Sequence, residues 1–175
     1  MKKLLTSLML AAAVMAPASA QTIVVNNGRV VTNTATGVIE NGGVVIRDGA
    51  IVDVGSSVSI PDGAEVIDAQ GGWITPGLFH PHTQLGLIEV GAEPSTHDDA
   101  ADESSFTAAI DVADGFNPSG THIDSARIEG LTRFAVHPNT GSAILAGRGA
   151  LADASGEPDS LFATRQFMLV DMSQS

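Results

Sequence analysis

The chain has 175 residues, no cysteine, and twenty carboxylates against eight lysines and arginines. Without cysteine it can form neither a disulfide bond nor a thiol nucleophile. Its formal charge of −12 at pH 7 repels nucleic acid and anionic lipid, whereas metal ions and cationic compounds remain compatible with it. A solvated acidic surface that keeps the protein soluble explains this charge at least as well as a specific cation site.

Residues 1–20 have the composition of a secretory signal peptide. Lys2 and Lys3 precede an apolar stretch of twelve residues, and the segment ends in Ala18-Ser19-Ala20, a small-residue cleavage site. We therefore expect cleavage after Ala20 and a periplasmic or secreted protein with no stable membrane insertion. An uncleaved N-terminal anchor is the alternative. No later segment is long and apolar enough to span a membrane.

Residues 21–76 are predicted to form a small β-sandwich. Asn26-Asn27-Gly28 and Asp48-Gly49 each separate two apolar runs, and both are sequences that favour tight hairpin turns. The stretch "AEVIDAQGGWIT" supplies two further short strands with a glycine break between them. Short strands at this spacing, with proline and glycine confined to the turns, are typical of a sandwich.

Residues 77–175 have a different pattern, in which strands alternate with helices. The expected elements, in chain order, are a strand in "GLFHPHTQLGL", an acidic loop, a helix from Ser104 or Ser105 to Gly115, a short helix ending at Gly130, a strand in "LTRFAVHP", one strand in the glycine-rich segment 139–153, and a last strand in "RQFMLVDM". This alternation favours parallel βα units.

Two of the five histidines lie one residue apart, at positions 80 and 82. In a strand, residues i and i+2 face the same way, so His80 and His82 would place two imidazoles on one face, with Cα atoms ~7 Å apart. Such a pair can bind one divalent ion, because metal–nitrogen bonds are about 2.0–2.1 Å long. Pro81 puts the motif at a strand end. Two surface histidines beside a proline are the simpler alternative.

The other histidines give weaker signals. His137 follows a predicted strand, where loops carry chemistry, and is a possible site-lining residue. His97 lies in the acidic loop beside Asp98 and Asp99, where contact with a cation is conceivable but a solvated side chain is the expected state.

The stretch "VIDAQGGWITPGLFHPHTQLGL" resembles the segment in which amidohydrolase-superfamily proteins leave their β-sandwich and enter their (β/α)8 barrel. The family pattern is close to V-I-D-A-x-G-x-x-V-T-P-G-L-I-D-x-H-x-H, and residues 66–69, Gly71 and 75–78 match it. The resemblance extends over about residues 22–90, and the later stretch "DVADGFNPSGTHIDSARIEGLTRFAVHPNTGSAILAGRGA" is similar to an exported, imidazolonepropionase-like branch of that family. The resemblance implies a divalent metal cofactor, most simply zinc, and a small amide substrate.

The metal motif departs from the family pattern. Only His82 keeps its residue type, since His80 stands at the family's aspartate and Gln84 at its second histidine. Either His80 replaces the lost ligand from the same face, or the subsite is degenerate and binds one metal or none. We take His82 as a ligand with His80 as its partner, and Gln84 as a possible site-lining residue.

The predicted fold is thus a signal peptide (1–20), a β-sandwich (21–76), and the first two or three βα units of an incomplete (β/α)8 barrel (77–175). A whole barrel takes ~250 residues, so we expect an N-terminal portion. The family's remaining ligands and catalytic aspartate lie on later strands, which places no catalytic residue in this chain. The predicted function is hydrolysis of non-peptide or cyclic amide C–N bonds by the parent enzyme, with this chain inactive alone. A non-catalytic folding or binding module is the alternative.

Overall fold

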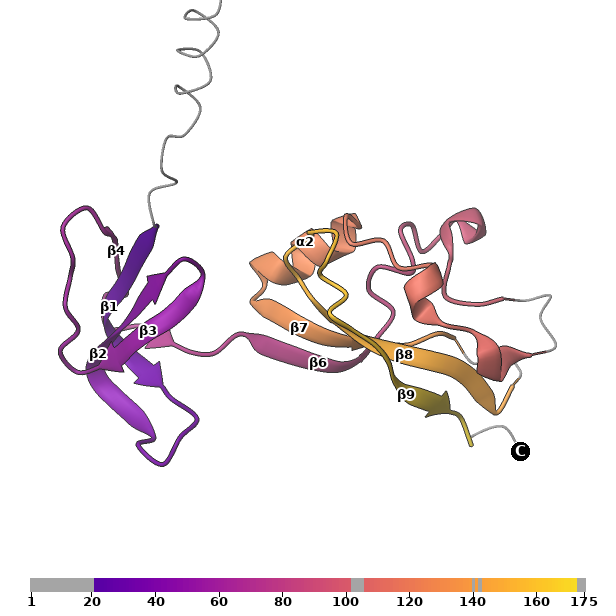
Figure 1. Cartoon of the computed structure of the whole chain (residues 1–175), viewed down its shortest axis with the longest axis horizontal. Helices are drawn as coiled ribbons and strands as arrows, with labels where there is room; N and C mark the ends of the chain where they lie inside the picture. The colour runs from indigo at the N-terminus through magenta and orange to yellow at the C-terminus, as the bar shows by residue number, and fades with distance from the viewer. Residues whose placement is uncertain (1–20, 102–105, 140, 142, 173–175) are drawn as a thin grey trace, which may run out of the picture. The chain divides into compact units, whose positions relative to one another are not determined.

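The protein is described here by a computed structural model, which covers residues 21–101, 106–139, 141 and 143–172. The predicted signal peptide, residues 1–20, lies outside the described residues. The chain divides into two compact units, Met1–Pro76 and Gly77–Ser175 (Figure 1).

The first unit is built around one mixed sheet. Its strands are β1 (Thr22–Val31), β2 (Val38–Arg47), β3 (Ala50–Gly55), β4 (Glu65–Asp68) and β5 (Trp73–Ile74). The order is β3-β2-β1-β4, with β5 also paired to β1. The pairs β1–β2 and β2–β3 are antiparallel, whereas β4 and β5 run parallel to β1.

The predicted turn at Asp48-Gly49 is confirmed. Asp48 and Gly49 have φ angles of 51° and 77°, and they join Arg47 to its cross-strand partner Ala50. Positive φ at both central residues is what a two-residue hairpin matched to the strand twist requires.

The predicted hairpin at Asn26-Asn27-Gly28 is wrong. Asn27 does have positive φ, 56°, but β1 continues through it, and the register to β2 shifts on both sides of Gly28. The segment is therefore a bulge within one long strand. The carbonyl oxygen of Asn27, which the bulge leaves unpaired with β2, accepts a hydrogen bond from the Gly71 amide at 2.7 Å. Glycine is needed at position 28, where a Cβ would lie 2.6 Å from the Ile74 side chain.

The long strand β1 organises the region that was predicted as a small β-sandwich. In the described part of the first unit all five strands belong to one hydrogen-bonded sheet. The ten-residue β1 pairs with β4 through its first half and with β5 through its second half. The buried apolar side chains of this sheet are Val24, Val30, Val44 and Val45.

The second unit contains a four-stranded sheet and few helices. Its strands are β6 (Leu78–Thr83), β7 (Leu131–Val136), β8 (Leu145–Asp153) and β9 (Ala163–Val170), in the order β6-β7-β8-β9. The helix α2 (Thr121–Ile128) and the 3-10 turns η2 (Pro94–Thr96), η3 (Thr107–Ala109) and η4 (Val112–Asp114) lie between β6 and β7.

Only one parallel βα unit is present among these strands, where two or three were expected. The pair β6–β7 is parallel, but β7–β8 and β8–β9 are antiparallel. The connections 137–144 and 154–162 are shorter than the dozen or more residues that a parallel crossover needs. The chain therefore turns back on itself after β7 and again after β8.

The expected helix ending at Gly115 is replaced by the turns η3 and η4, and its predicted caps, Ser104 and Ser105, lie outside the described residues. Ile110 between the two turns is extended, with φ −59° and ψ 136°. Its carbonyl accepts a hydrogen bond from the Arg148 amide at 2.8 Å, and Asp111 forms a parallel bridge with the same residue. Pairing with β8 thus holds the middle of the segment out of a helix. The helix ending at Gly130 is confirmed as α2.

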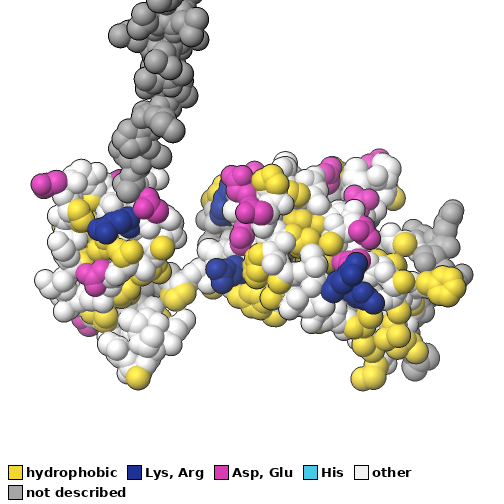
Figure 2. Space-filling model, viewed as in Figure 1, with side chains coloured by type: hydrophobic (Ala, Val, Ile, Leu, Met, Phe, Trp, Pro, Cys, Tyr) yellow, Lys and Arg dark blue, Asp and Glu magenta, His cyan; other side chains and the backbone are white. Residues whose placement is uncertain are grey.

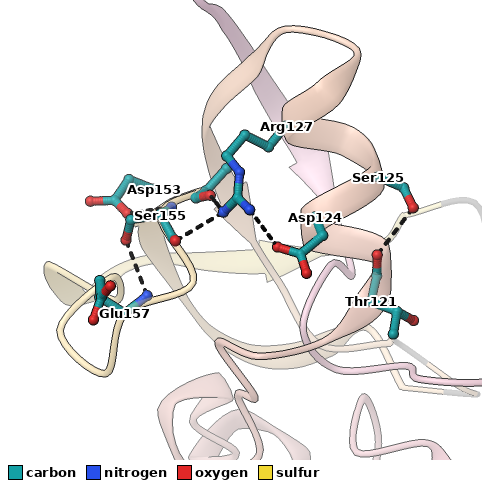
Figure 3. A network of polar contacts seen from close by, with 8 residues as sticks. Thr121, Asp124, Ser125, Arg127, Asp153, Ser155 and Glu157 are labelled. Carbon is teal, nitrogen blue, oxygen red and sulfur yellow. Dashed lines mark hydrogen bonds and ion pairs between the residues drawn. The ribbon is translucent and has the colours of Figure 1, made fainter.

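A polar network fixes the last turn of α2 to the loop after β8 (Figure 3). The Arg127 guanidinium donates to the carbonyl oxygens of Ala154 and Ser155 at 2.8 and 2.9 Å, and to the Asp124 carboxylate at 2.7 Å. One side chain therefore satisfies two backbone carbonyls and holds the crossover helix beside the sheet.

The core of the second unit lies between this sheet and α2. Phe134 on β7 is fully buried and packs with Leu87, Ile123 and Val136, opposite the buried alanines of β8. Other apolar side chains remain at the surface of each unit (Figure 2), among them Met168 and Val170 on the edge strand β9.

Substitution of Phe134 should show how far this unit depends on its core. Phe134→Ala is expected to lower the free energy of unfolding by about 3–5 kcal/mol, because it removes a fully buried ring. Phe79→Ala is the matched control, since Phe79 is 55% exposed, and its cost should be well below that range. Urea denaturation followed by circular dichroism measures both; equal costs would contradict this description of the core.

Candidate functional site

The carboxyl ends of the parallel strands β6 and β7 bring two histidines together. His82 is the fifth residue of β6, and His137 directly follows β7. The Nδ1 atom of His82 lies 3.0 Å from Nε2 of His137, and the ring centroids are 3.9 Å apart at an interplanar angle of 52°. The two tilted rings are thus in contact, and one nitrogen of each lies within hydrogen-bond distance of the other.

The hydrogen bonds of His137 define its protonation. Its Nδ1 lies 2.9 Å from the Pro138 carbonyl oxygen, which only accepts, so Nδ1 carries the proton. His137 is 5% exposed, and this burial lowers the pKa of its imidazole below the ordinary 6.5, with the neighbouring His82 acting in the same direction. The neutral ring then presents a lone pair at Nε2, and Nδ1 of His82 is the donor that faces it.

His80 does not join this pair. Its Nδ1 accepts a hydrogen bond from the backbone amide of His82 at 3.2 Å, and the side chain is exposed. The predicted shared face of His80 and His82 assumed regular alternation, but the β6–β7 register shifts between His80 and Thr83. Pro81 lies in this irregular stretch and cannot donate a ladder hydrogen bond. The ring contact of His82 is consequently with His137.

Gln84 lies beside the histidines and binds a buried carboxylate. Its Nε2 donates to Asp99 Oδ2 at 2.8 Å, and Asp99 is only 5% exposed. The backbone reinforces this, because the Asn139 amide donates to the Asp99 carbonyl at 2.6 Å. The sequence did not single out Asp99 as a buried residue. Its burial depends on the partner Gln84, fifteen residues away, and no local sequence signal marks that contact.

A cavity of about 400 Å³ lies beside the two histidines and Gln84. His82, Gln84 and His137 form one side, and Leu169, Val170 and Asp171 at the end of β9 form another. Gln84 and His137, which the sequence analysis names as possible site-lining residues, lie beside His82 in this cavity wall, whereas the part played by β9 was not predicted. The cavity combines imidazoles, an amide and an apolar wall, which suits a small polar molecule with an apolar part.

The cavity contains some, but not all, of the donors of a metal site. Two ligand nitrogens on a tetrahedral ion with bonds of 2.0–2.1 Å lie roughly 3.3 Å apart, close to the 3.0 Å between the two histidines. Among residues 21–101, 106–139, 141 and 143–172, however, no group of three or more histidine, cysteine, aspartate or glutamate side chains is arranged to hold a metal. The distance between the two nitrogens is therefore compatible with two positions of a divalent site, but the rings, with centroids 3.9 Å apart, are not both aimed at one point.

Comparison with known proteins identifies the fold. No family model and no curated protein matches the sequence. Among solved structures, an amidohydrolase from Thermotoga maritima MSB8 superposes with a TM-score of 0.72 at 24% identity, over 83% of this chain and 38% of that one. The amidohydrolase resemblance is thus confirmed at the level of the fold, and the chain spans well under half of that protein's length.

Other structural neighbours agree only in part. A D-hydantoinase is 39% identical over 41% of this chain and 15% of its own, with a TM-score of 0.33. The L-hydantoinase (dihydropyrimidinase) of Arthrobacter aurescens is 18% identical over 63% of this chain and 19% of its own, with a TM-score of 0.37. Overlaps this low carry no argument, so the fold assignment depends on the Thermotoga protein.

Burial of His137 predicts a pH-dependent stability. Since its folded-state pKa lies below 6.5, the unfolded chain takes up the proton first as the pH falls. The contribution of His137 is therefore complete above pH 6.5 and is lost below it, by at most about 1.4 kcal/mol per pH unit. Denaturation of the metal-free protein between pH 7.5 and 5.5 should show this slope, and His137→Gln should flatten it. An unchanged slope in His137→Gln would contradict the burial described here.

Proposed function

We propose that these residues belong to a metal-dependent hydrolase that cleaves C–N bonds other than peptide bonds, in small linear or cyclic amides. The observation that carries the proposal is the gathering of His82, His137 and Gln84 in one cavity at the carboxyl ends of two parallel strands. The fold around that cavity is shared with an amidohydrolase, which gives the reaction class its support.

The chain's own residues would bind and orient a substrate in this cavity. A divalent ion, when bound, would polarise the scissile carbonyl and acidify a water molecule. Of the two ligands expected from the sequence, His82 lies in the cavity wall, and His80 would have to release its contact with the His82 amide to reach the same ion. Leu169 and Val170 offer an apolar wall for the substrate, and Gln84 retains a carbonyl oxygen that can accept from an amide N–H.

The same observations limit what these residues can do alone. The described residues hold no three-donor metal cluster. The Asp99 carboxylate is buried against Gln84, so it is poorly placed to take a proton from water in the cavity. We therefore propose that the 175-residue chain by itself does not turn over substrate.

A non-catalytic binding module is the second candidate function. It is favoured by Gln84, which stands where the resembling family has a histidine and whose amide nitrogen is bound to Asp99. A protein with this arrangement would keep the fold and the cavity while lacking the ligand set for catalysis.

Assays on cyclic amides separate the two candidates. The protein expressed from its full natural reading frame should open five- or six-membered cyclic amides in the presence of Zn²⁺, as followed by chromatography. His82→Ala should abolish the activity, and His122→Ala, an exposed histidine on α2, should not. The purified 175-residue chain should be inactive.

Two results would contradict this account. Absence of hydrolysis across the whole panel, with Zn²⁺ bound, would leave the binding module as the function. Metal-dependent turnover by the 175-residue chain would show that its site is more complete than described.

We also propose that the protein is exported through its first twenty residues. Within the part of the chain that the structure describes, no helix is long and apolar enough to cross a membrane. The periplasmic protein should begin at Gln21 when its N-terminus is read by mass spectrometry, because the cleavage site ends at Ala20. A chain that retains Met1 and sediments with membranes would overturn the proposed export.

A further inference from the structure

The contact between His82 and His137 joins two residues that are 55 positions apart, and the resemblance to amidohydrolases assigns no role to His137. We infer that His82 and His137, rather than His82 and His80, are the imidazole pair of a divalent transition-metal site in this cavity. The inference deepens the proposed function by naming His137 as the second ligand. It rests on the proposed function only in assuming that a divalent ion occupies the cavity.

The nitrogen–nitrogen distance suits a shared ion, but the rings must turn to aim at it. The two nitrogens are 3.0 Å apart, against roughly 3.3 Å for two imidazoles on one tetrahedral ion, whereas the ring centroids are only 3.9 Å apart, so the ring of His82 has to rotate away from that of His137. His82 is exposed, which leaves its ring free to rotate and gives an ion a route to its nitrogen. An ion that binds Nδ1 of His82 displaces the proton held there, which moves to the other ring nitrogen or is released to water.

His137 is already fixed in the form that a ligand requires. Its Nδ1–H donates to the Pro138 carbonyl, which sets the tautomer and holds the ring, and this leaves a lone pair on Nε2, the atom that lies 3.0 Å from Nδ1 of His82. Metal-bound histidines commonly donate their second ring N–H to a backbone carbonyl or a carboxylate in this manner. His80 lacks such support, because its Nδ1 accepts from the backbone amide of His82.

The surroundings favour a cation. The buried Asp99 carboxylate interacts electrostatically with His137, and Asp171 contributes to the cavity wall. Imidazole nitrogens prefer Zn²⁺, Cu²⁺ or Ni²⁺, whereas Mg²⁺ prefers oxygen ligands. The predicted occupant is therefore a borderline transition-metal ion, and the preference for nitrogen distinguishes this site from the acidic surface.

Titration with Zn²⁺ tests the assignment. Calorimetry on the 175-residue chain in excess Mg²⁺, which occupies carboxylate sites, should show one weak Zn²⁺ site. His82→Gln and His137→Gln should each weaken it by roughly tenfold or more, since each removes a ligand. His80→Ala and His97→Ala, which change histidines outside the pair, should alter the affinity by less than about twofold.

A gain-of-function variant makes the test stronger. Gln84→His should raise the affinity by about tenfold or more, because it adds an imidazole beside the pair and Asp99 can accept its ring N–H as it now accepts from Gln84. Circular dichroism checks that each variant folds. If the buried His137 tolerates no substitution, the exposed His82→Gln and His80→Ala still decide between the two pairs.

Three outcomes would overturn the inference. The first is a loss of affinity in His80→Ala as large as in His82→Gln, which would restore the pair predicted from the sequence. The second is displacement of all the zinc by Mg²⁺, and the third is normal zinc binding by a folded His137→Gln variant. None of these depends on catalysis. Failure to hydrolyse amides would count against the proposed function and leave the zinc site intact.

Discussion

The parallel pairing of β6 with β7, interrupted at Pro81, is the constraint on which the site depends. Parallel pairing brings the carboxyl ends of the two strands together and so places His82 near His137. The register shift between His80 and Thr83 then ends the alternation that would have put His80 beside His82. This irregularity in the six-residue strand β6 therefore determines that His82 contacts His137 and not His80.

Around this strand pair the second unit supplies support from distant parts of the chain. Phe134 anchors β7 in the core, and Arg127 fixes the crossover helix to the loop after β8. Asp99 reaches Gln84 from the acidic loop, and β9 closes the cavity. The fold shared with an amidohydrolase thus carries a cavity lined by two imidazoles, the side chains of Gln84 and Asn139, and Asp171.

Local rules in the sequence predicted most elements and failed where distant pairing decided the outcome. Asp48-Gly49 folds as predicted because a two-residue turn is determined by its own φ preferences. Asn26-Asn27-Gly28 has the same chemistry and forms a bulge, because residues 69–72 pair with it. Residues 107–114 do not form the predicted helix, because pairing with β8 holds Ile110 extended. The contacts of His82 with His137 and of Gln84 with Asp99 join residues far apart in the sequence, and no local pattern predicts them.

The most direct test of this account is the N–N coupling across the hydrogen bond between His82 and His137. In metal-free, ¹⁵N-labelled protein near pH 7.5, we predict a measurable coupling between Nδ1 of His82 and Nε2 of His137, with the proton of His137 on Nδ1. Absence of that coupling, together with nuclear Overhauser contacts between the rings of His82 and His80, would contradict the account. It would support the pair of His80 and His82 that the sequence predicted.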